Sequence, residues 1–92
     1  MHRITLACED VPPELGPAAA IDITEEFTHR QWHQNVRCEW DRTRLLLYAE
    51  NDWDGDAKAL IDEFSDAISA CIQGGFEGGI KIVVIDNAPG QK

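Results

Sequence analysis

The alternation of apolar and polar residues along the chain predicts four strands and one helix, and it leaves one further segment open between the two. The first strand is expected near the start, where Ile4, Leu6 and Cys8 alternate with Thr5 and Ala7. The two prolines at positions 12 and 13 end this strand, because proline cannot continue a central ladder.

A β-hairpin is predicted in the middle of the chain by two alternating runs that a short polar turn separates. The run at 32–40 places Trp32 and Trp40 on its apolar side and His33 on its polar side. The second run spans residues 44–50. One side of this hairpin is therefore expected to face the core.

A helix follows the hairpin, because apolar residues from position 57 onwards recur at helical spacing and form a stripe about a third of the circumference wide. Asp54 or Asp56 can cap its start, and the pair Gly74-Gly75 is expected to end it. The β-branched run at 80–85 then predicts a buried central strand.

Residues 17–30 fit two interpretations. Pro17 is favourable at the first position of a helix, and Ile23 and Phe27 share a helical face, whereas Ile21 and Ile23 also alternate with polar residues as in a strand. We favour the helix, which gives a single α+β domain over residues 1–92. It has an antiparallel four-stranded sheet with two helices on one face, in the ferredoxin-like order β-α-β-β-α-β. The alternative is a five-stranded sheet with one long helix.

The negative charge of the chain is concentrated between Glu50 and Asp66. This stretch carries seven carboxylates and one lysine, out of a formal net charge of −9 for the whole chain. A local negative field is a feature that a basic partner can recognise, and carboxylates along a rigid helix can imitate a nucleic-acid backbone. The predicted partner-binding residues are Asp52, Trp53, Asp54, Asp56, Asp62, Glu63 and Asp66.

These observations favour a small, non-enzymatic, acidic interaction protein that binds and modulates a basic partner, such as a nuclease or a nucleic-acid-binding complex, with inhibition as the favoured outcome. Direct contact with nucleic acid or an anionic membrane is disfavoured, because the chain has only 8 basic residues and 17 acidic ones.

The start of the chain lacks a signal-peptide pattern and the cysteine count is odd, so a cytoplasmic protein is expected. A homodimer is a further possibility. The opposing hypothesis is that the carboxylates only cap and solvate the helix, or pair with arginines between residues 29 and 44.

A metal-dependent domain or a small enzyme is the alternative from another class. Asp52, Asp54, Asp56 and Glu63 occupy positions 1, 3, 5 and 12 of an EF-hand calcium loop. Position 6, where the loop requires glycine, is Ala57, which argues against calcium. The sequence has no serine-nucleophile motif, so we predict no catalytic residue, no metal ligand and no cofactor.

Overall fold

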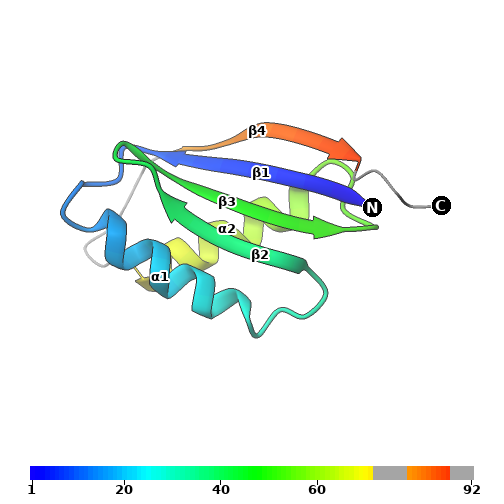
Figure 1. The fold of residues 1–92 in the computed structure, drawn as a ribbon, viewed down its shortest axis with the longest axis horizontal. Helices are drawn as coiled ribbons and strands as arrows, with labels where there is room; N and C mark the ends of the chain where they lie inside the picture. The colour runs from blue at the N-terminus through cyan, green and yellow to red at the C-terminus, as the bar shows by residue number, and fades with distance from the viewer. Residues whose placement is uncertain (72–78, 88–92) are drawn as a thin grey trace.

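The protein is a small α+β domain (Figure 1). The structure is a computed structural model that describes residues 1–71 and 79–87. The elements follow in the order β1 (His2–Glu9), α1 (Gly16–Phe27), β2 (Gln34–Trp40), β3 (Arg44–Asn51), α2 (Lys58–Cys71) and β4 (Ile80–Asn87). The predicted four-stranded sheet with two helices is confirmed, and the five-stranded alternative is wrong because residues 16–27 form a helix. The end predicted for α2 at Gly74-Gly75 lies outside the described residues.

All strand pairs of the sheet are antiparallel, and the strand order is β2-β3-β1-β4. The two strands at the centre are therefore β1 and β3, in a register that places Leu6 opposite Leu47 and Cys8 opposite Leu45. These side chains point to the same face, on which the helices pack (Figure 1). The opposite face of the sheet carries no helix among the described elements.

The core lies between the sheet and the helices. Ile23 of α1 and Phe64 of α2 are fully buried against Ile4 and Leu47 of the central strands. On each helix the buried residues recur three or four positions apart, so one stripe of the helix faces the sheet. The described helices include none that is long and apolar enough to cross a lipid bilayer.

The position of β4 differs from the prediction. This strand is the last in the sheet order, and it pairs with β1 alone among the described strands. Ile82, Val83 and Val84 are 47%, 47% and 45% exposed, so the prediction of a buried central strand is wrong. A β-branched run indicates strand propensity, but it does not distinguish a central strand from an edge strand.

The start of β2 also differs from the prediction. The strand begins at Gln34 rather than at residue 32, and its pairing with β3 is irregular between Gln34 and Arg37. Asn35 has a positive φ of 53°, which breaks the regular alternation of side chains. Trp32 is consequently 52% exposed and His33 only 5% exposed, the reverse of their predicted orientations.

Candidate functional site

The loop between β3 and α2, which holds several of the predicted binding residues, is organised by the buried side chain of Asn51. Its Oδ1 accepts hydrogen bonds from the backbone N–H groups of Trp53 at 3.1 Å and Asp54 at 2.8 Å. Because backbone N–H groups can only donate, these contacts identify the oxygen of the amide. The Nδ2 group of Asn51 therefore faces Nδ1 of His33, at 3.1 Å.

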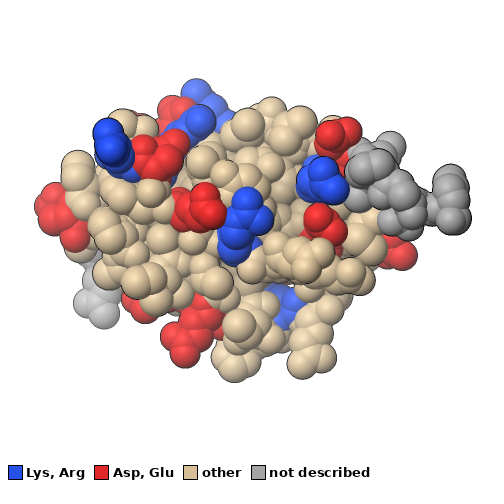
Figure 2. All heavy atoms as spheres, in the orientation of Figure 1, with Lys and Arg blue, Asp and Glu red and all other residues tan. Residues whose placement is uncertain are grey.

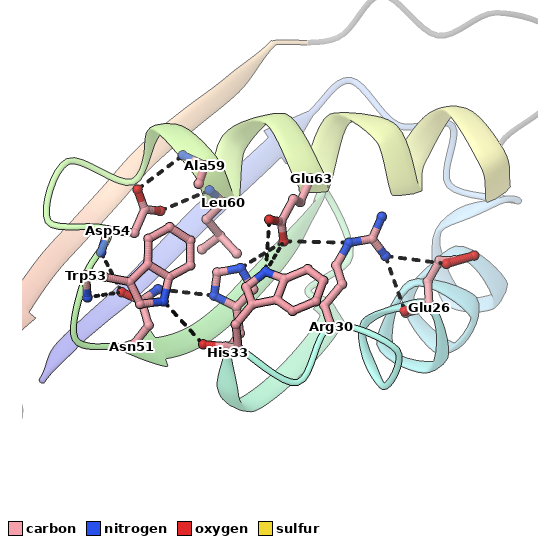
Figure 3. Close-up of polar contacts among 10 residues, drawn as sticks. Glu26, Arg30, His33, Asn51, Trp53, Asp54, Ala59, Leu60 and Glu63 are labelled. Carbon is pink, nitrogen blue, oxygen red and sulfur yellow. Dashed lines mark hydrogen bonds and ion pairs between the residues drawn. The ribbon is translucent and has the colours of Figure 1, made fainter.

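His33 is held by this contact in a single tautomer. Its Nδ1 accepts the hydrogen bond from Asn51, so the ring proton lies on Nε2. Nε2 donates this proton to Oε1 of Glu63 at 2.8 Å (Figure 3). The side chain of His33 has no exposed surface. Its role is thus to join the end of β3 to α2 from the inside.

Glu63 is surrounded by donors from the segment between α1 and β2. Besides His33, the indole Nε1 of Trp32 donates to its Oε2 at 3.1 Å, and Nε of Arg30 lies 3.6 Å from its Oε1. Arg30 also donates to the backbone oxygen of Glu26 at 3.3 Å (Figure 3). The charge of Glu63 is compensated within the chain, so this residue is a structural link rather than a free acid.

Two exposed indoles enclose the buried imidazole. The ring of His33 stacks on Trp53 with centroids 5.5 Å apart, and it is tilted against Trp32 at 6.3 Å. Nε1 of Trp53 donates to the backbone oxygen of Trp32 at 3.4 Å. Trp32 is 52% exposed and Trp53 is 49% exposed. We call Trp32, His33 and Trp53 the tryptophan cluster. It presents two large side chains to solvent in fixed orientations.

Asp54 has a different environment from the one that a binding role requires. It is 5% exposed, and its carboxylate accepts hydrogen bonds from the backbone N–H groups of Ala59 at 3.1 Å and Leu60 at 3.0 Å (Figure 3). The prediction that Asp54 caps the helix is confirmed, and the residue is not available at the surface. Asp56 remains exposed and accepts from the backbone N–H of Lys58 at 3.2 Å.

The other predicted carboxylates lie on the surface, and α1 adds further ones that the sequence analysis did not include. We call the exposed carboxylates of the two helices the acidic helical surface. Among the residues that the structure describes, none of them has an ion-pair partner. The spacing of acidic residues within α1 was the signal that could have revealed half of this surface. Its members are Asp22 and Glu25 of α1 and Asp62 and Asp66 of α2.

A polar hollow of about 430 Å³ lies along the acidic helical surface. Asp22, Glu25 and Glu26 line it from α1, with Cys71 from the end of α2. Burial raises the pKa of the Cys71 thiol, and the negative charges of Asp22 and Glu26 raise it further. Carboxylates therefore predominate in the lining of this hollow, which also includes His29.

Charge is distributed differently over the sheet. Each strand carries one basic and one acidic residue, whereas the two helices together carry six carboxylates and one lysine. Ion pairs follow the open face, including Arg3 with Glu50 and Lys81 with Glu9. Figure 2 shows basic and acidic side chains interspersed over this side of the molecule. Among the described residues, the negative charge without an ion-pair partner thus lies on the helical layer and on the loops that precede α1 and α2.

The four carboxylates of the calcium-loop hypothesis do not meet. Asp54 points into the start of α2, while Glu63 points to His33 and Arg30. Ala57 does adopt a positive φ of 63°, the conformation that glycine would supply at this position. In the described part of the chain, no group of three or more acidic, histidine or cysteine side chains is placed to hold a metal ion.

The cysteines are all free and two of them are buried in the core. Burial raises the pKa of the Cys38 thiol to about 12 and that of Cys8 to about 11. Both thiols are therefore protonated at neutral pH, and neither is a reactive nucleophile.

A second hollow, of about 370 Å³, lies between the end of α1 and β2, and residues including Thr24, Arg30 and Val36 line it.

Comparison with known proteins adds no function to this geometry. No family model matches the chain, and no significant similarity to a curated protein or to a solved structure was found.

Proposed function

We propose that this protein is a non-enzymatic binding module that docks a basic protein. Its docking surface consists of the tryptophan cluster, the acidic helical surface, and the loop carboxylates of Asp52 and Asp56. The observation that carries the proposal is the pair of half-exposed tryptophans, Trp32 and Trp53, which are fixed by hydrogen bonds. Asp52, the neighbour of Trp53 in the chain, and the carboxylates of the acidic helical surface have no ion-pair partner among the described residues.

The two tryptophans supply the apolar part of such an interface. Covering the exposed half of each indole removes about 100 Å² from water, which corresponds to about 2.5 kcal/mol per residue. Both side chains are already held in place, Trp32 by Glu63 and Trp53 by stacking on His33. Binding therefore costs little additional side-chain entropy, which is the property of a hot-spot residue.

The carboxylates supply the electrostatic part. Asp62 and Asp66 lie one helical turn apart and repel each other, and this repulsion is relieved when a cation binds between them. Glu63 lies between them in sequence and contacts Trp32, so the tryptophan cluster adjoins the same helix that carries these two carboxylates. A surface of this kind attracts a partner rich in lysine and arginine, such as the nucleic-acid groove of a nuclease or of a nucleic-acid-binding complex.

The chemistry of the site supports binding rather than catalysis. The imidazole of His33 is enclosed and its two nitrogens are engaged by Asn51 and Glu63. The buried thiols are protonated at neutral pH. A general base needs access to a substrate proton, and the side chain of His33 has no exposed surface.

Affinity capture followed by a comparison of matched variants tests the proposal. The wild-type chain is used to capture a basic protein at low salt, and the dissociation constant of that protein is then measured for variants. Asp62→Asn/Asp66→Asn and Asp10→Asn/Glu14→Gln each remove two exposed carboxylates, but Asp10 and Glu14 belong to the loop between β1 and α1, outside the proposed docking surface (Figure 1).

We expect the α2 variant to bind at least about tenfold more weakly, because two surface charges contribute about 0.7 kcal/mol each in a partly desolvated interface. The loop variant keeps wild-type affinity. Trp53→Ala weakens binding by a similar or larger factor. Equal effects of the two charge variants, or unchanged affinity of Trp53→Ala, contradict the proposed surface.

We also infer a split β-α-β topology of the ferredoxin-like kind. Helix α1 connects β1 and β2, and β3 lies between these two strands in the sheet. Helix α2 and the segment after it connect β3 and β4, and β1 lies between those two strands. A solved structure in which the order of the strands differs from β2-β3-β1-β4 would remove this inference.

A further inference from the structure

The outer edge of β4 is a second candidate interface, and it is separate from the docking surface. β4 pairs with β1 on one side, and no described strand pairs with its other side. Ile82, Val83 and Val84 of this strand are each nearly half exposed. An edge of β-branched residues is a template for main-chain pairing with a further strand.

A β-bulge in β4 determines which residues share a face. Leu6 of β1 pairs with Ile82 and the preceding Thr5 pairs with Val84, so Val83 is the extra residue. In a regular strand, residues an odd number of positions apart point to opposite faces. Because of the bulge, Lys81 and Asp86 instead point to the same face of the sheet, the one opposite the helices.

We propose that β4 pairs antiparallel with β4 of a second copy of this chain, about a two-fold axis between residues 83 and 84. In this register all eight residues of the strand are paired, since Ile80 faces Asn87 and Lys81 faces Asp86 of the second copy. Residues that face each other across an antiparallel pair must point to the same side. The bulge satisfies this condition, and without it this full-length register would place facing residues on opposite sides.

Charge complementarity selects a second copy as the occupant of this edge. β4 has one basic and one acidic residue, Lys81 and Asp86, placed symmetrically about its centre. The two-fold axis therefore generates two opposite-charge pairs across the interface, together with pairs between Ile82 and Ile85. The sheets of the two copies join into one continuous sheet of eight strands with both helical layers on the same side.

Lys81 is able to change partner when the dimer forms. In the isolated chain its Nζ lies 3.3 Å from Oε1 of Glu9, and its side chain is 67% exposed. Glu9 also lies within 4.0 Å of Arg44, so it keeps a cation when Lys81 turns towards the second copy. The exchange leaves no carboxylate of this group without a basic neighbour.

Two charge variants and their mixture test the register. The mass of the full chain is measured by sedimentation and native mass spectrometry over a range of concentrations, for the wild type, Lys81→Asp and Asp86→Lys. We expect the wild type to be a concentration-dependent dimer. Each single variant places like charges opposite each other twice and weakens the dimer about tenfold or more.

Mixing the two variants is the decisive step. In the mixed dimer each aspartate of one chain faces a lysine of the other, so an equimolar mixture restores dimer at the wild-type concentration. A merely structural role of Lys81 or Asp86 cannot produce this rescue, because the fold of each chain is unchanged by mixing. Thermal melting followed by circular dichroism checks that each variant is folded.

Val83→Lys provides an independent disruption at a half-exposed position, should either charge variant fail to fold. It is expected to be a folded monomer. Four results would each overturn the proposal. Two concern the wild type, which would stay monomeric at every concentration or form assemblies larger than a dimer. The others are a Val83→Lys chain that dimerises like the wild type, and folded charge variants whose mixture stays monomeric. Loss of the dimer leaves the docking surface intact, so binding of the basic partner distinguishes the two proposals.

Discussion

Replacement of Asp54 by alanine is expected to destabilise the fold far more than replacement of Asp56, although the two carboxylates lie two residues apart and carry the same charge. Asp54 accepts two backbone hydrogen bonds at the start of α2, at 3.1 and 3.0 Å, and it is 5% exposed. Asp56 accepts one hydrogen bond at 3.2 Å and is exposed to solvent.

The magnitude follows from what each change leaves behind. Asp54→Ala removes the capping carboxylate and thereby leaves the backbone N–H groups of Ala59 and Leu60 without an acceptor in a site that water reaches poorly. Each unsatisfied group costs about 1–2 kcal/mol. The total is about 2–4 kcal/mol of unfolding free energy. For Asp56→Ala, water replaces the lost acceptor at Lys58, so the cost is about 0.5 kcal/mol or less.

Urea denaturation followed by circular dichroism measures both values under one condition. The two variants change the net charge equally, so a general charge effect cancels in the comparison. In a separate thermal melt, the expected destabilisation for Asp54→Ala lowers the melting temperature by at least about 8 °C for a domain of this size. Equal midpoints for the two variants would refute the assignment of Asp54 as a buried cap.

Three further predictions concern single residues. The hydrogen bonds of His33 to Asn51 and Glu63 require its ring proton to lie on Nε2. The ¹⁵N chemical shifts of the imidazole are therefore expected to show an unprotonated Nδ1. A protonated Nδ1 in the folded protein would contradict this network. Arg42 has a φ of 83°, so Arg42→Gly is expected to raise the unfolding free energy by about 1 kcal/mol while Arg42→Ala leaves it unchanged, as urea midpoints would show. The pKa of Cys38 is raised from 9.0 to about 12 in the folded chain, so the unfolded chain releases this proton first and the unfolding free energy falls as pH rises above 9. Cys38→Ala removes this part of the fall. Parallel plots of unfolding free energy against pH for the two proteins would argue against the raised pKa.

Local patterns in the sequence predicted most of the secondary structure. The helical spacing of Leu60, Phe64 and Ile68 marked α2, and Asp54 was identified as a candidate for its cap. Residues 16–27 fit helix and strand equally on alternation alone. Gly16 and Pro17 begin a helix there, because Pro17 lies in its first turn and Gly16 leaves room for the ring of Trp40.

The parts that could not be predicted depend on neighbours that are distant in the sequence. The β-branched run of β4 gave no information on whether β4 lies at the centre or the edge, because that is decided by strand order. The orientation of His33 depends on the irregular start of β2 near Asn35. Asp62 and Glu63 are adjacent acids on one helix, yet only Glu63 faces Trp32, His33 and Arg30, so burial and exposure follow from packing.

The salt dependence of partner binding tests the central claim most directly. The measurement is the dissociation constant of the captured basic protein as a function of salt, for the wild type and for Asp62→Asn/Asp66→Asn. The account predicts that the affinity of the wild type falls steeply between about 50 and 500 mM salt, and that the variant gives a weaker affinity with a shallower slope. A wild-type affinity that does not change with salt, or identical slopes for the two proteins, would contradict docking through the acidic helical surface.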